Sequence, residues 1–201
     1  YIKQLNTEKA ISVSYKNLSI HHKISKIANQ QIPLFRLKHD VQQAGYLKSK
    51  NYKINGLDEF NEIGKEILNR KENQEDINFS KKILLKEKET KSLLPFYKAE
   101  YIYLPPNLPG GSLNPHKDWD EIEMEYFSSP KQIIYIDNFL SKEAIKEIRE
   151  FCLVSKIWVR QYDNKYLGAF SDKGFISPMH LQIATELRKK LPKLFGKYNL
   201  E

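Results

Sequence analysis

The sequence predicts an α+β fold, mostly helical in its N-terminal region, with short strands alternating with helices towards the C-terminus. Apolar residues recur at helical spacing in several segments before residue 104. A segment dense in proline and glycine, 104–115, then interrupts these patterns, because neither helix nor sheet tolerates that density. Beyond it, an apolar run at 133–136 precedes two helical patterns with N-cap signals.

The first region, 1–30, contains one amphipathic pattern. Apolar residues between 7 and 28 recur near helical spacing, and Pro33 ends the pattern. The sequence EKAISVSYKNLSI resembles the second helix of a tetratricopeptide repeat. A lone amphipathic helix would have the same pattern, so residues 1–30 are interpreted as the end of such a repeat or as a single helix.

Residues 31–103 are predicted to form a helical lead-in. One helix is expected from Leu37 to about Lys50 and another from Asp58, an acceptable N-cap. His39 and Asp40 are expected at the start of the first helix, with Asp40 as a cap and His39 exposed. A loop is expected at 71–80. The segment 81–97 fits a helix or a strand equally well.

The Pro/Gly-rich segment predicts a linker at 104–118, followed by a second region at 119–201. A short helix is expected from Trp119 to Phe127, before the strand. The run Ile133–Ile136 predicts a strand that is buried on both faces. Ser141 predicts the cap of a helix that reaches about Cys152.

The last part of the chain predicts one more strand and one more helix. Aromatic residues enclose the short run Tyr166–Phe170, which predicts a strand. Ser177 and Pro178 together are a strong helix start, as N-cap and first-turn proline. This helix is expected to end at Pro192.

Composition excludes some classes of function. The chain has 201 residues and a formal net charge of +8, but lysines supply most of the positive charge and alternate with acids. Such a pattern is typical of a solvated surface, and nucleic acid is an unlikely partner. No apolar run predicts a membrane span or signal peptide, and the single cysteine fits the cytoplasm. A start at Tyr1 suggests a fragment of a longer reading frame.

The segment 132–200 resembles the opening of a known catalytic domain. Its elements IIYIDNFLS, YLGAF and PMHLQIATELRKKLPKLFG are similar, in order and wording, to bacterial iron(II)/2-oxoglutarate-dependent oxygenases of the prolyl-hydroxylase-like, tetratricopeptide-linked group. The segments 32–47 and 113–127 resemble the helical lead-in of these proteins. The resemblance implies the first elements of a double-stranded β-helix, which this chain is too short to complete.

The resemblance also implies a function for an intact parent protein. The parent would use iron(II) and 2-oxoglutarate to hydroxylate a protein, a peptide or another substrate. Tyr166 and Phe170 lie on a strand that can line the pocket in relatives, although ordinary core aromatics would fit the same pattern. The iron ligands are expected beyond Glu201, so this part is expected to be inactive and to bind neither cofactor tightly.

One set of residues mimics the ligand motif of these oxygenases. His116 and Asp118 form a His-x-Asp pair, and His180 and Arg188 follow at family-like separations. Their context argues against a site, because His116 lies in the Pro/Gly-rich loop and His180 on the apolar face of a helix. We therefore expect no catalytic or metal-binding residue in this chain. The alternative function is a non-catalytic helical module that binds a protein partner.

Overall fold

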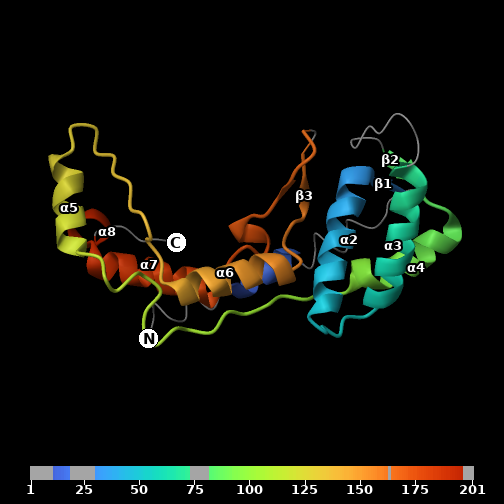
Figure 1. The fold of residues 1–201 in the computed structure, drawn as a ribbon, viewed down its shortest axis with the longest axis horizontal. Coiled ribbons are helices and arrows are strands. Elements are labelled where there is room, and N and C mark those ends of the chain that lie inside the picture. The colour runs from blue at the N-terminus through green and yellow to red at the C-terminus, as the bar shows by residue number, and fades with distance from the viewer. Residues whose placement is uncertain (1–10, 19–29, 73–81, 163, 197–201) are drawn as a thin grey trace. The chain divides into compact units, whose positions relative to one another are not determined.

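A computed structural model describes residues 11–18, 30–72, 82–162 and 164–196. The described chain is rich in helix and contains two small antiparallel sheets (Figure 1). It divides into two compact units. Unit 1 comprises Tyr1–Tyr103 and Leu153–Phe175, and unit 2 comprises Leu104–Cys152 and Ile176–Glu201. The segment 153–175 therefore belongs with the N-terminal helices rather than with the elements that flank it in sequence.

Three helices dominate unit 1. Helices α2 (Leu34–Ser49), α3 (Leu57–Glu72) and α4 (Glu87–Lys98) lie side by side, and α3 contacts both of its neighbours (Figure 1). Residues 11–18 form a further helical stretch, whereas the rest of the predicted helix at 7–28 lies outside the described residues. The similarity to a tetratricopeptide repeat thus stays a prediction.

A two-stranded sheet accompanies these helices. Strand β1 (Gln31–Pro33) pairs antiparallel with β2 (Lys82–Leu84), and Ile32 lies opposite Ile83. The segment 81–97, which fits helix or strand by its pattern, contains both, because α4 starts soon after β2. The backbone amide of Lys86 donates to the carboxylate of Glu89 at 2.8 Å, which fixes the helix start.

The core of unit 1 forms where the three helices meet. Phe60 of α3 is fully buried, with its ring 4.3 Å from that of Phe96 and edge-on to Tyr97 at 5.0 Å. Such aromatic pairs add to the free energy of burial. The fully or nearly fully buried aliphatic side chains around them are Leu37, Leu47, Ile67, Leu85 and Leu93.

The packing of α2 on α3 requires a glycine at position 64. A Cβ added at Gly64 would overlap Cγ2 of Val41, whereas one added at Gly45 would lie 3.6 Å from Asn61 Oδ1, an ordinary contact. We expect Gly64→Ala to lower the free energy of unfolding by about 1–3 kcal/mol through overpacking. Gly45→Ala should instead leave it unchanged or raise it by up to about 1 kcal/mol, since alanine favours helix. Urea denaturation of both variants checks this, and equal effects would contradict it.

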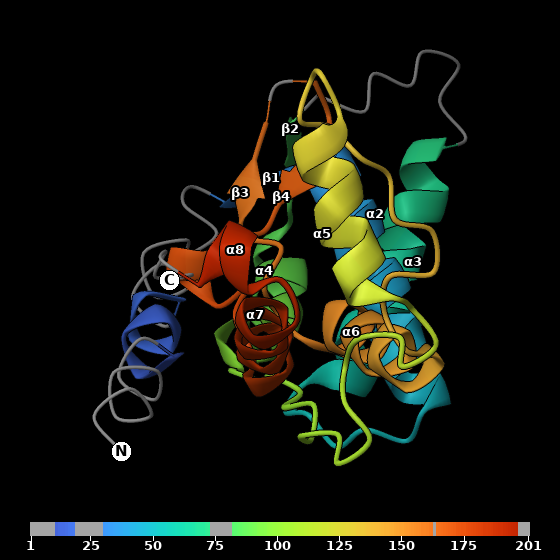
Figure 2. The same cartoon turned by 90° about the vertical axis from the view of Figure 1, so that its left-hand side faces the viewer.

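Unit 2 is built on helices α5 (Trp119–Ser128), α6 (Lys142–Val154, whose last two residues lie in unit 1), α7 (Pro178–Lys190) and α8 (Pro192–Phe195). Figure 2 shows these elements in a view turned by 90° from that of Figure 1. Trp119 and Leu191 are buried in a core shared by α5, α7 and the loops around them. Glu123 of α5 accepts hydrogen bonds from the amides of Lys193 and Leu194, which joins α5 to α8.

Helix α7 holds the Pro/Gly-rich segment in place. Within that segment the structure assigns only an isolated bridge, between Leu113 and Leu140. The carboxylate of Glu186 accepts hydrogen bonds from the amides of Ser112 and Leu113 and from the Ser112 hydroxyl. Burial opposes ionisation, but these bonds outweigh it and lower the pKa of Glu186. The loop is therefore ordered by side-chain bonds instead of by a ladder.

The strand predicted at Ile133–Ile136 does not form, and the prediction that it is buried on both faces is wrong. The segment is not assigned to a strand, and Ile133 and Tyr135 are 60% and 91% exposed. Gln132 and Asn138, both with φ near 50°, bracket it. An apolar run favours extended backbone, but a ladder also needs a neighbouring strand. None of the described residues supplies one.

Candidate functional site

The residues that mimic the iron-binding motif do not form a cluster. His116 is exposed, and its amide donates to the side chain of Asn114 at 3.0 Å. Asp118 is the N-cap of α5 and accepts from the amide of Glu121 at 3.0 Å. Arg188 lies in the last turn of α7. Asp118 thus has a structural role as a helix cap.

His180 is held by its own helix start. Its Nδ1 lies 2.7 Å from the hydroxyl of Ser177, the N-cap residue, and its ring packs edge-on against Phe151 at 5.5 Å. Burial lowers the pKa of His180 and favours the neutral ring. Across the described residues, no three His, Cys, Asp or Glu side chains gather in a way that could hold a metal ion.

Tyr166 and Phe170 lie on or beside a short hairpin in unit 1. Strand β3 (Arg160–Gln161) pairs antiparallel with β4 (Leu167–Gly168), so the strand predicted at 166–170 is shortened to two residues. Phe170 caps the 3-10 helix η2 (Ser171–Lys173) that follows.

The hairpin presents an aromatic and cationic cluster. The rings of Tyr162 and Tyr166 stack at 4.4 Å with an interplanar angle of 15°. The guanidinium of Arg160 lies 5.2 Å from the ring centroids of both Tyr162 and Phe170. Tyr166 is half-exposed, so one face of the cluster can meet a ligand. We call Arg160, Tyr162, Tyr166 and Phe170 the hairpin cluster.

A buried charged network lies on α2. It includes Asp40, for which the predicted role as a helix cap is wrong. Asp40 is not an N-cap: it lies in mid-helix, is 3% exposed and pairs with Nε of Arg36 at 2.7 Å. The Tyr97 hydroxyl and the His39 ring complete its contacts, at 2.9 and 3.0 Å. The spacing of Arg36 and Asp40, four residues apart on one helix, is the signal that could have identified this pair.

The network shifts the ionisation of its members. Burial alone would raise the pKa of Asp40. The charge of Arg36 and the hydrogen bond from His39 have a larger, opposite effect, so the pKa of Asp40 lies below its ordinary value. Burial acts against the charge of Arg36 as well, yet Asp40 raises the pKa of the guanidinium overall. The pair is therefore ionised at neutral pH.

Lys156 is a second buried cation. Its ammonium donates to the carbonyls of Phe96, Tyr97 and Ala99, which close the C-terminal end of α4, at 3.2, 2.8 and 3.0 Å. A cation at this end of a helix is favoured by the helix dipole. Burial nevertheless lowers the pKa of Lys156 to about 8. A lysine in a sequence with many basic residues is expected at the surface, so the sequence does not predict the burial of Lys156.

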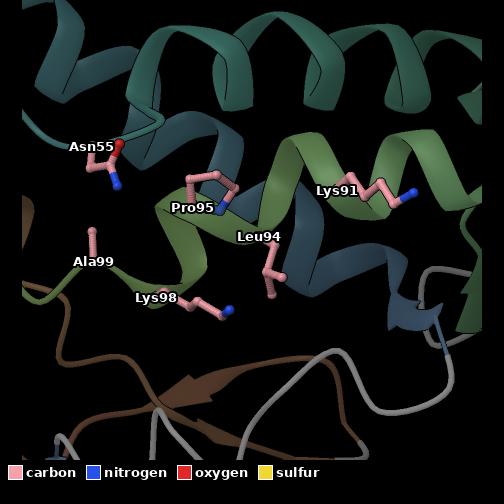
Figure 3. A pocket seen from close by; sticks show the side chains of 6 residues that line it. All are labelled: Asn55, Lys91, Leu94, Pro95, Lys98 and Ala99. Carbon is pink, nitrogen blue, oxygen red and sulfur yellow. The ribbon is translucent and has the colours of Figure 1, made fainter.

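Two further features offer no catalytic chemistry. Cys152 of α6 is half-buried, and burial raises the pKa of its thiol, which disfavours a nucleophilic thiolate. Figure 3 shows a hollow on α4 lined by Asn55, Lys91, Leu94, Pro95, Lys98 and Ala99. Its lining contains two lysines and an amide, but no acid, imidazole or hydroxyl.

Comparisons with known proteins identify no relative. No family model matches the chain, and no curated protein or solved structure matches it either. Of the helices described, none has the length and apolar character that crossing a membrane requires.

Proposed function

We propose that this chain is part of an iron(II)/2-oxoglutarate-dependent oxygenase, to which it contributes a helical lead-in and the first elements of the catalytic barrel. In intact form the oxygenase would hydroxylate a peptide or another substrate. The order of elements supports the proposal. The segment 133–136 is followed by α6, by the β3–β4 hairpin and by α7. This is the order of the three sequence segments that resemble the family.

The observation that carries the proposal is the segment 133–136, in which alternate side chains, those of Ile133 and Tyr135, are exposed. Ile133 and Tyr135 face solvent, and among the described residues the backbone groups of Ile134, Tyr135 and Ile136 have no hydrogen-bond partner. Extended backbone with β-branched and aromatic side chains is the conformation of a sheet strand. A strand with unpaired backbone and uncovered apolar side chains favours addition of a neighbouring strand. The first strand of an unfinished barrel would have these properties.

The described residues do not fit an iron site. The imidazoles of His116 and His180 belong to a loop and to a helix start, and the carboxylate of Asp118 is occupied as a helix cap. The proposal therefore assigns no metal ligand to these residues and derives no chemical step from them. Their contribution would be to the wall and support of the pocket, with Tyr166 and Phe170 as the proposed contacts to cosubstrate or substrate.

The proposal is tested first by the reading frame downstream of the Glu201 codon. It should encode a His-x-Asp motif and a later histidine followed by arginine or lysine. Absence of these residues would contradict the proposal.

A binding experiment tests the assignment of ligands within the chain. Anaerobic calorimetry of the 201-residue protein with iron(II) and then 2-oxoglutarate should show no cosubstrate binding that depends on the metal. Metal-dependent binding that is abolished by His116→Ala or His180→Ala would overturn the assignment. A parallel titration with 2-oxoglutarate alone identifies binding that does not need the metal.

A further inference from the structure

We infer that Arg36 and Gln43 of α2 are positioning residues for the hairpin cluster, so that the helical lead-in supports the proposed ligand contacts of Tyr166 and Phe170. The hydrogen bonds from α2 to residues 153–158 do not depend on the proposed function. The functional meaning of the hairpin cluster rests on that function.

Gln43 forms hydrogen bonds with the start of the segment 153–175. Its Nε2 donates to the carbonyl oxygens of Leu153 and Ser155, at 3.1 and 3.0 Å. A side-chain amide carries two N–H donors, and these two bonds use both. One side chain of α2 thus holds two backbone groups more than a hundred residues away in sequence.

Arg36 holds the same segment three residues beyond Ser155. Its Nη1 donates to the carbonyl oxygen of Trp158, while its Nε is fixed by Asp40. The ring of His39 also meets the Trp158 ring edge-on at 6.2 Å. Because the guanidinium is planar, the bond to Asp40 orients the donor that reaches Trp158.

The other side of the segment is fastened to the end of α4. Lys156 reaches three carbonyls there, as described above, and its backbone amide donates to the carbonyl of Tyr101 at 3.1 Å. The Ser155 hydroxyl accepts from the amide of Tyr103 at 2.9 Å. Ser155 and Ile157 are fully buried, which places these bonds away from water.

The hairpin begins directly after this fastened stretch. Arg160 follows Trp158 by two residues, so the direction in which β3 leaves is set by the bonds at 153–158. The orientation of the hairpin cluster therefore depends on α2 and α4. A contact residue held on a short hairpin needs such second-layer support to keep its geometry.

The test uses two adjacent glutamines of α2. Gln43→Leu removes both donors at similar volume, and Gln42→Leu is the matched control because Gln42 is exposed. We expect Gln43→Leu to raise amide exchange about tenfold over 153–162, with α3 unchanged, since two hydrogen bonds are lost. Gln42→Leu should have no effect. Exchange within about twofold of the parent protein at 153–162, or an equal rise in α3, would overturn the inference.

The fluorescence emission of Trp158 provides a second readout. Under native conditions, a general loss of stability would not change it, because the protein stays folded. In a Trp119→Phe background Trp158 is the only tryptophan of the chain. Gln43→Leu and Arg36→Lys should each shift its emission to longer wavelength while far-ultraviolet circular dichroism stays the same. Unchanged emission in both variants would contradict a positioning role. Neither readout requires iron or 2-oxoglutarate, so failure of the docking and failure of the proposed function are distinguishable.

Discussion

Replacement of Asp40 by alanine is expected to lower the free energy of unfolding of unit 1 by about 3–5 kcal/mol, the usual cost of leaving a buried charge without its partner. Asp40 is 3% exposed, and its carboxylate accepts hydrogen bonds from Arg36, His39 and the Tyr97 hydroxyl. Its removal leaves the guanidinium uncompensated between α2 and the segment 153–175. The loss should exceed that of any exposed ion pair in the chain.

Urea denaturation followed by Trp158 fluorescence in a Trp119→Phe background measures this loss. The background should be mild, because the indole nitrogen of Trp119 has no hydrogen-bond partner among the described residues. Glu62→Ala is the control, since Glu62 pairs with Lys48 at 3.6 Å on the surface and should change stability by less than about 1 kcal/mol. A similar loss in both variants would contradict the buried-pair interpretation.

The same carboxylate gives unit 1 a defined dependence on acid. The pKa of Asp40 is lower in the folded chain than its ordinary value, so its stabilisation is complete above that ordinary value. It is lost as the pH falls through the lowered pKa, because the folded state must then take up a proton that the unfolded state has already bound. Asp40→Asn should therefore flatten the acid side of the stability profile.

Phe60→Ala is the second substitution with a large expected effect, a loss of about 3–5 kcal/mol. The ring is fully buried between Phe96 and Tyr97, and its removal leaves a cavity where α3 meets α4. Phe127→Ala is the matched control, because that ring is half-exposed on α5 and its loss should change stability by less than about 0.5 kcal/mol. Urea denaturation curves of the two variants provide the comparison. Equal midpoints would contradict the assigned core.

Local signals predicted the helices well. Ser141 is the helix cap that the sequence predicts, and it accepts from the amide of Ala144 at 3.2 Å. Asp118 was not predicted as a cap, but it lies directly before the predicted helix and accepts from the amide of Glu121 at 3.0 Å. Both signals lie within a few residues of the helix that they start, so one sequence is enough to detect them. The start at Pro178 is confirmed for the same reason, although the Ser177 hydroxyl bonds to His180 rather than to a backbone amide.

Features that depend on distant residues were not predictable. The run at 133–136 predicts extended backbone, but its composition cannot tell whether a neighbouring strand exists. The burial of Lys156 and the bond from Arg36 to Trp158 depend on groups that lie 57 or more residues away in sequence. No local pattern contains such a partner. The hairpin cluster was not predictable either, because Arg160 contacts the ring of Phe170 only when β3 pairs with β4.

The division of the chain has a practical consequence for splitting the protein in two. The polypeptide passes between the units after residues 103, 152 and 175, so a cut at Gly110-Gly111 gives two pieces of which neither contains all of unit 1. The shorter piece would contain Lys156. The longer piece would contain the C-terminal end of α4, whose carbonyl oxygens accept the hydrogen bonds of Lys156. Co-expressed halves would need one another to fold, which makes this glycine pair a natural site for a split-protein reporter.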